Sequence, residues 1–129
     1  MKLMKTIAPL ILSAAMLTAC AGYATPPAAP ARLADGVLTG SNGMTLYTFD
    51  KDAAGSGKSI CNGPCATNWP PLLVADGESA GSDYSVVMRD DDRKQWAYKG
   101  KPLYYWVKDQ KPGDRTGDGF NNAWRVARP

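Results

Sequence analysis

The feature that most constrains the fold is a phrase that the chain contains twice. Residues 46–52 read LYTFDKD and residues 103–109 read LYYWVKD, so Leu, Tyr, an aromatic residue, Lys and Asp recur at the same relative positions. One copy of about 50 residues buries too little surface to be stable alone. We therefore expect two tandem repeats, about residues 36–74 and 84–127, which pack about a pseudo-twofold axis and share one core.

Each copy of the phrase has the alternation of a β-strand. Alternate side chains of an extended chain face the same side, so the Tyr and the aromatic residue two positions later share a face. Aromatic residues also favour strands. The Asp comes where the chain must leave the sheet, and an Asp there can accept N–H groups of the following loop. We expect structural roles for six motif residues: Tyr47, Phe49, Asp52, Tyr104, Trp106 and Asp109.

Turn signals around the two copies complete an all-β pattern. Asn42-Gly43 and Lys99-Gly100 are typical of hairpin turns, and residues 90–92 (DDD) read as the solvated tip of another hairpin. Residues 123–127 (AWRVA) are the last expected strand, and helical periodicity is absent after the N-terminal segment. The sequence predicts a small single all-β domain at residues 33–129, built from two hairpin-based repeats with six or seven short strands.

The N-terminal segment has a different character. Lys2 and Lys5 flank the start of an apolar run that has the length of a signal-peptide core and is shorter than the about 20 residues of a membrane span. The run ends in LTAC, which resembles the bacterial lipoprotein box. We expect a signal peptide at residues 1–19, then a lipidated Cys20 and a Pro- and Ala-rich tether at residues 20–32. An ordinary secretory signal with an incidental Cys is the alternative.

Lipidation of Cys20 predicts a place in a bacterial cell envelope, because two or three acyl chains anchor a protein stably in a membrane. In the lipoprotein sorting rule, Asp after the lipidated Cys retains the protein at the inner membrane. Ala21 therefore indicates the outer membrane, with the domain facing the periplasm. Without Lys2 and Lys5, 13 of the 15 Lys and Arg remain against 12 Asp and Glu, and this balance predicts no nucleic-acid partner.

The repeated motif carries a family resemblance. The spacing Tyr, any residue, aromatic, two residues, Asp resembles that of predicted bacterial lipoproteins with a repeated Yx(F/W/Y)xxD motif, also described as secreted repeats of unknown function. The segments CNGPCATNWPPL and KPGDRTGDGFNNAWRV resemble those that follow the two motifs in that family. The likeness covers roughly residues 33–127 and implies no established activity. Many relatives have His after the closing Trp, where this chain has Arg125.

Two cysteines remain after Cys20, and they are close in sequence. Outside the cytoplasm, Cys61 and Cys65 in CNGPC are expected to form a disulfide across a tight turn. Two other interpretations stay open. A copper site with two thiolates needs a further ligand, and Met44 or Met88 has to replace the usual His. A thiol-disulfide catalyst needs a lowered thiol pKa, for which Lys58 is the nearest cation in sequence.

Acidic and aromatic clusters give weaker functional signals. Asp109, Asp114 and Asp118 lie in a Gly-rich loop that lacks the calcium-loop pattern, so turns explain them without a metal. The recurring aromatic residues are expected to form the core. Tyr105 is the best candidate for an exposed ligand surface, because its repeat partner is Thr48.

The composition argues against catalysis. The chain has no His, so a Ser hydroxyl has no ordinary activating base. We expect no enzyme, no cofactor and no metal, but a lipid-anchored envelope protein that binds a protein partner or has a structural role. The alternative is a metal or thiol-redox accessory protein that uses Cys61 and Cys65. The sequence does not determine the oligomeric state.

Overall fold

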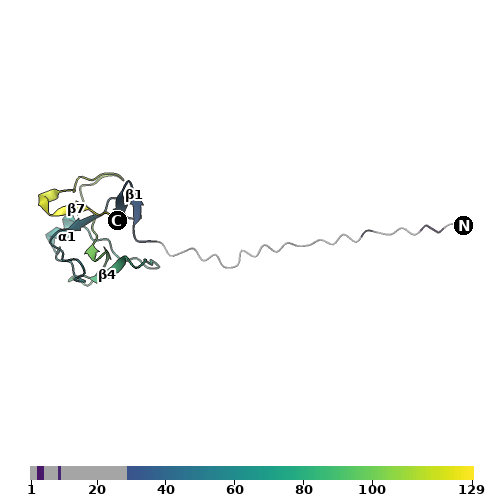
Figure 1. Cartoon of the computed structure of the whole chain (residues 1–129), viewed down its shortest axis with the longest axis horizontal. Coiled ribbons are helices and arrows are strands. Elements are labelled where there is room, and N and C mark those ends of the chain that lie inside the picture. The colour runs from purple at the N-terminus through teal and green to yellow at the C-terminus, as the bar shows by residue number, and fades with distance from the viewer. Residues whose placement is uncertain (1–2, 5–8, 10–28) are drawn as a thin grey trace.

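The computed structural model describes residues 3–4, 9 and 29–129, drawn in colour in Figure 1. Cys20 and the predicted tether up to residue 28 lie outside the described residues. Within the described part of the chain, no helix is long and apolar enough to cross a membrane.

The domain is nearly all-β and confirms the predicted fold class. It has seven short strands, one α-helix of five residues and one 3₁₀ turn. The elements in chain order are β1 (Arg32–Ala34), β2 (Val37–Thr39), β3 (Tyr47–Phe49), α1 (Pro64–Asn68), β4 (Tyr84–Met88), β5 (Lys94–Tyr98), β6 (Lys101–Pro102), η1 (Phe120–Asn122) and β7 (Trp124–Val126).

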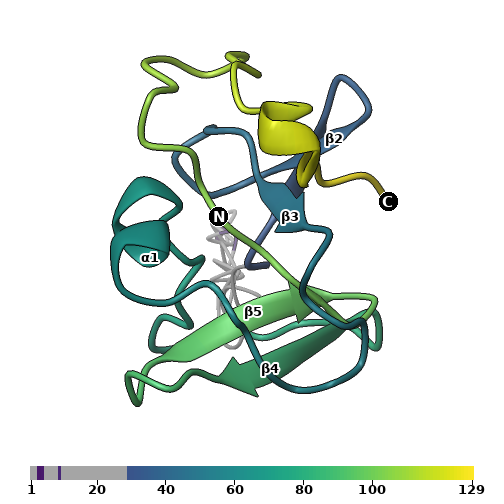
Figure 2. The ribbon, with the colours of Figure 1, turned by 90° about the vertical axis from the view of Figure 1, so that its left-hand side faces the viewer.

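The strands form three small antiparallel sheets. These are β1-β2, β3-β7 and β4-β5-β6. Figure 2 shows the β4–β5 hairpin at the lower end of the domain and β2 and β3 at the upper end, with α1 at one side. The predicted turns at both Gly positions lie where expected: Thr39 bridges to Thr45 around Gly43, and Tyr98 pairs with Lys101 around Gly100. The acidic tip joins β4 to β5.

The closing segment of each repeat pairs with the hairpin of the other repeat. Leu38 N donates to Ala127 O, Ala127 N donates to Leu46 O, and Leu46 N donates to Leu38 O, at 2.8, 2.8 and 2.9 Å. The same cycle of backbone bonds recurs in the other half, at 2.8, 2.9 and 3.0 Å, between Trp96, Leu72 and Leu103. The two repeats are therefore interlocked rather than placed side by side, and neither completes its own sheet.

Aromatic rings stack through the centre of this interlocked pair. Trp69 and Trp124 hold equivalent positions in the two repeats, and their rings stack at 3.8 Å with an interplanar angle of 3°. Trp106 stacks on the outer side of Trp69 at 3.9 Å, and Phe49 stacks on the outer side of Trp124 at 4.3 Å. The four-ring stack thus follows the same pseudo-twofold symmetry as the backbone, and all four residues are buried.

Gly117 lies against this stack and needs its small size. A Cβ atom at this position would come within 2.7 Å of the Trp69 ring and 3.0 Å of the Tyr47 ring. Such contacts are closer than real Cβ atoms make, so a side chain here would displace one of the two aromatic residues.

Three details differ from the sequence-based expectations. A short helix, α1, begins at Pro64, although no helix was expected. Five residues are too few to show a helical period in the sequence. Pro favours the first position of a helix, which is where Pro64 lies. Arg32 begins β1, and Ala31 is buried, so the chain joins the domain before residue 33. The second motif is not a regular strand, because Tyr104 makes only isolated bridges to Tyr47 and Pro71.

Candidate functional site: the paired motifs

The two motif tyrosines meet at the centre of the domain. Tyr47 N donates to Tyr104 O at 2.7 Å, and Tyr104 N donates to Tyr47 O at 2.9 Å. Both side chains are fully buried. This pair of reciprocal backbone bonds joins the two copies of the motif directly, on the pseudo-twofold axis.

Each motif tyrosine binds the aspartate of the other motif. Tyr47 Oη donates to Asp109 Oδ2 at 2.6 Å, and Tyr104 Oη donates to Asp52 Oδ2 at 2.5 Å. The two carboxylates are buried, with exposures of 2% for Asp52 and 8% for Asp109. Each repeat therefore supplies the hydroxyl donor that the buried carboxylate of the other repeat needs.

The second oxygen of each aspartate accepts a backbone N–H from its own loop. Ile60 N donates to Asp52 Oδ1 at 2.8 Å, and Thr116 N donates to Asp109 Oδ1 at 3.0 Å. The Thr116 hydroxyl adds a further bond to Asp109 at 2.6 Å. A buried carboxylate is costly without such donors. The motif aspartates thus fix the loops that follow them and join those loops to the opposite repeat.

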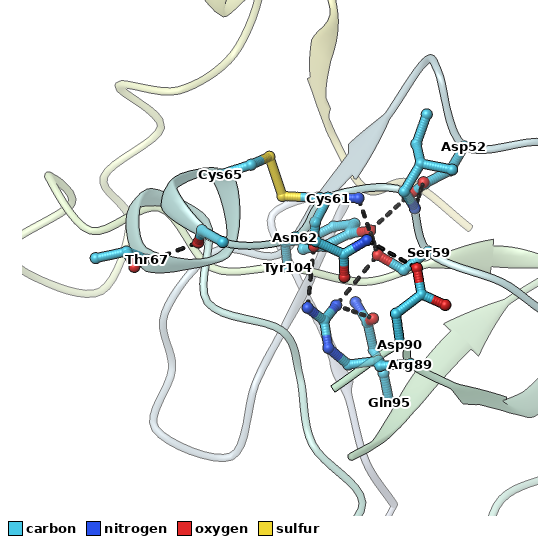
Figure 3. The surroundings of a disulfide bond; sticks show 12 residues. Asp52, Ser59, Cys61, Asn62, Cys65, Thr67, Arg89, Asp90, Gln95 and Tyr104 are labelled. Carbon is cyan, nitrogen blue, oxygen red and sulfur yellow. Dashed lines mark hydrogen bonds between the residues drawn. A yellow bond between two sulfur atoms is a disulfide. The ribbon is translucent and has the colours of Figure 1, made fainter. Parts of the chain in front are cut away.

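Around Asp52 the network extends further and includes a buried cation (Figure 3). Ser59 Oγ lies 2.6 Å from Tyr104 Oη and accepts a hydrogen bond from Arg89 at 3.1 Å. The Arg89 guanidinium has no exposed side-chain surface and also donates to Gln95 Oε1, Cys61 O and the half-exposed Asp91 carboxylate. This network connects the first-repeat loop to β5 and to the end of β4.

The expected disulfide is present and confirms that prediction. Cys61 and Cys65 are joined by an S–S bond, with their Cα atoms 5.2 Å apart. Figure 3 shows the bond linking α1 to the segment just before it, close to Arg89 and Tyr104. Cys61 is fully buried and Cys65 is partly buried against the aromatic core. The disulfide closes the loop of the first repeat at Cys61, whose carbonyl oxygen accepts a hydrogen bond from Arg89.

Burial and hydrogen bonding change the acidity of both motif tyrosines. Removal from water raises the pKa of Tyr47 well above its ordinary range, and the hydrogen bond to the Asp109 carboxylate raises it further. Burial raises the pKa of Tyr104 in the same way, again reinforced by its bond to Asp52. Both hydroxyls therefore stay protonated as donors at neutral pH.

The remaining acidic residues serve local turns. Asp114 accepts the N–H groups of Gln110 and Lys111, and Asp118 accepts that of Val126. Asp91 pairs with Arg89 and Arg93 at the hairpin tip, and these cations hold the pKa of its carboxyl well below its usual range. Among the described residues, no group of three or more His, Cys, Asp or Glu side chains is arranged to hold a metal ion.

Tyr105, the expected ligand surface, is partly buried in the structure. It packs at the second apolar cluster, and a Cβ atom on Gly40 would come within 2.0 Å of its hydroxyl oxygen. Gly40 is therefore what makes room for Tyr105, and the ring does not form an open platform. Among the exposed apolar side chains, Val107 lies two residues further on and lines a groove together with Phe120 from η1.

The residue after the second closing tryptophan is the one in which this chain departs from many of its relatives. Arg125, which follows Trp124, forms an ion pair with Asp50 at 3.2 Å on the surface. Exposed pairs of this kind contribute little to stability, typically about 0–1 kcal/mol.

Comparison with known proteins gives a family and no activity. The model of a family described as a secreted repeat of unknown function matches this chain twice, at residues 32–73 and 85–128. No curated protein and no solved structure matches it. The two matched segments correspond to the two repeats seen in the structure.

The crossed Tyr–Asp bonds predict a specific pattern of energetic coupling. Tyr47→Phe and Asp109→Ala, combined in a double-mutant cycle, should show a coupling of about 1–2 kcal/mol in the free energy of unfolding, because each removes the same buried bond. The free energies are measured by urea denaturation followed by tryptophan fluorescence.

The matched control pairs Tyr47→Phe with Asp52→Ala, at the aspartate of its own motif. That pair should show a coupling below about 0.5 kcal/mol, because these side chains do not bind each other. Equal coupling in both cycles would contradict the crossed arrangement.

The raised tyrosine pKa values predict a loss of stability in alkali. Because each folded pKa lies above the unfolded value of about 10, the stabilisation is complete below pH 10 and decreases as the pH rises above it. Two such groups give a slope of up to about 2.7 kcal/mol per pH unit. Burial also raises the pKa of Tyr84 and Tyr105, which add to this slope. Urea denaturation between pH 9 and 11.5 measures the slope, from which Tyr47→Phe or Tyr104→Phe should each remove up to about 1.4 kcal/mol per pH unit. An unchanged slope in both variants would show that other groups control it.

Proposed function

This chain belongs to the family of secreted repeats of unknown function, and we propose that it is a lipid-anchored, non-enzymatic binding or structural protein of the bacterial cell envelope. The observation that carries the proposal is the crossed pair of Tyr–Asp bonds. The polar groups that the family motif repeats are buried and bind one another. They support a rigid fold and are not directed at a substrate.

The absence of catalytic chemistry at the motif supports the non-enzymatic part. A motif tyrosine with a raised pKa is a poor base and a poor nucleophile, and each motif carboxylate is already bonded to donors on both oxygens. The sequence offers no His to activate a hydroxyl. The motif therefore has the character of a structural centre that holds its surface loops in place.

The sequence before the domain supports the anchor and its location. The signal ends in LTAC, and Ala21 follows the Cys that would be lipidated. The domain begins about ten residues later with the buried Ala31. A short Pro-rich segment in between suits a tether that connects a membrane anchor to a folded domain. We place the protein at the outer membrane, facing the periplasm, with an envelope protein as its macromolecular partner.

The alternative function uses the two domain cysteines for copper or for thiol-redox chemistry. In the structure both sulfur atoms are bound to each other, which favours a structural bridge. The ring that they close is small, so the chain-entropy contribution is only about 2 kcal/mol.

The anchor prediction is tested on Cys20. The protein should incorporate radioactive palmitate and fractionate with membranes, and Cys20→Ser should abolish both. The double variant Cys61→Ser/Cys65→Ser is the matched control and should keep both properties. If Cys20→Ser still fractionated with membranes without detergent, the lipid anchor would be wrong. Ala21→Asp should move the protein to the inner membrane.

The thiol prediction separates the structural bridge from the accessory function. Protein from the envelope should show no free thiol at Cys61 or Cys65 before reduction, by titration with an alkylating reagent. Replacing both with Ser should lower the free energy of unfolding by about 1–3 kcal/mol. Copper retained in stoichiometric amount, measured by elemental analysis, would instead support the accessory function.

A further inference from the structure

The second motif and the loop that follows it border an open surface groove. It is lined by Trp106, Val107, Lys108, Gln110, Thr116 and Phe120, and its volume is about 600 Å³. Small-molecule sites in proteins typically measure about 300–1,000 Å³ and combine an apolar lining with a few polar groups. The groove has this size and this composition.

The apolar side of the groove is built from exposed aromatic and aliphatic surface. Phe120 is 39% exposed and Val107 is 55% exposed, although both are large apolar side chains. The Phe120 ring lies 4.8 Å from the Trp106 ring and is tilted by 46°, so it extends the central aromatic stack to the surface. Asn121 and Asn122, both with positive φ, form the tight turn that carries Phe120. Grouped exposed apolar residues of this kind mark binding surfaces.

The charge of the groove is positive. Lys108 is the one charged residue in the lining, and it forms no ion pair with the residues that the structure describes. The carboxylates of the same loop are engaged elsewhere, since Asp109 binds Tyr47 and Asp114 binds backbone N–H groups. Gln110, which carries a side-chain amide, also lines the groove. An anion that enters the groove therefore meets the Lys108 ammonium group, which forms no ion pair with either carboxylate.

The first repeat lacks the apolar part of this arrangement. By the register of the motifs, Asp50 occupies the position of Val107, and it is paired with Arg125. By the register of the closing tryptophans, Cys65 occupies the position of Phe120, and the disulfide holds it against the loop. Lys51 is the counterpart of Lys108. The groove is thus a feature of the second repeat, where no disulfide closes the loop.

We propose that this groove binds a small planar aromatic carboxylate, whose ring lies against Phe120, Trp106 and Val107 and whose carboxylate meets Lys108 and Gln110. Aromatic rings pair favourably in tilted and offset arrangements such as the one that Trp106 and Phe120 already form. The inference rests on the proposed non-enzymatic binding function and gives that function a ligand class.

The test uses the full lipidated chain in lipid nanodiscs and equilibrium dialysis with radiolabelled 2-naphthoate, with empty nanodiscs as the blank. Lys108→Gln should weaken binding about three- to fivefold through the lost ion pair, and Phe120→Ala about five- to tenfold through the lost apolar contact. Lys51→Gln, at the counterpart of Lys108, and Ile60→Ala, at an exposed apolar residue of the first-repeat loop, are controls and should bind within about twofold of the unchanged protein. Near-ultraviolet circular dichroism checks that all four variants are folded.

The neutral analogue 2-naphthamide isolates the role of charge. It should bind the unchanged protein about three- to fivefold more weakly than 2-naphthoate, and Lys108→Gln should bind both compounds equally. Naphthoate retained no better than on empty nanodiscs, or bound equally by all four variants, would overturn the site. Recovery of chemically altered naphthoate would contradict the non-enzymatic function while leaving the site intact.

Discussion

The structure depends on two buried carboxylates whose hydroxyl donors come from the opposite half of the chain. Asp52 and Asp109 are buried, and a buried ionised group without donors costs several kcal/mol. Each repeat alone has the carboxylate and the loop N–H, but its tyrosine points to the other carboxylate. Only the assembled pair satisfies both acids. The bonds thus make the two repeats one cooperative unit, in agreement with the interlocked sheets and the shared aromatic stack.

The spacing of the motif follows from this geometry. Tyr and the aromatic residue two positions later must share a face, because one reaches the opposite aspartate while the other joins the ring stack. The aspartate must follow at the end of the extended segment, because one of its oxygens faces inward to the tyrosine and the other receives an N–H from the loop. A Phe in place of either Tyr would keep the packing and leave a buried carboxylate without its donor.

Much of the fold was accessible from the sequence, since it is encoded by local signals. The repeated phrase, Asn42-Gly43 and Lys99-Gly100 were enough for the all-β class, the two repeats and the hairpins. The pairing of each closing segment with the hairpin of the other repeat could not be predicted from the sequence. A sequence repeat shows which residues are equivalent, but it does not show whether a segment pairs within its own copy or with the other copy. The same limit applies to the partners of Asp52 and Asp109. Tyr105 was assigned to the surface from its Thr partner in the alignment, whereas its environment depends on Gly40, which is distant in sequence.

The differences between the repeats locate the part of the protein that is free to acquire a function. The crossed Tyr–Asp bonds recur in both copies, because a change in one copy leaves a group of the other copy unsatisfied. The loops after the two motifs share one feature, a backbone N–H bonded to the motif aspartate, and their other contacts differ. One loop is closed by a disulfide around Cys65, while the other presents Phe120 and Lys108 to solvent. The features that the two repeats share are therefore those that folding requires, and the loops in which the repeats differ are where a binding function can arise.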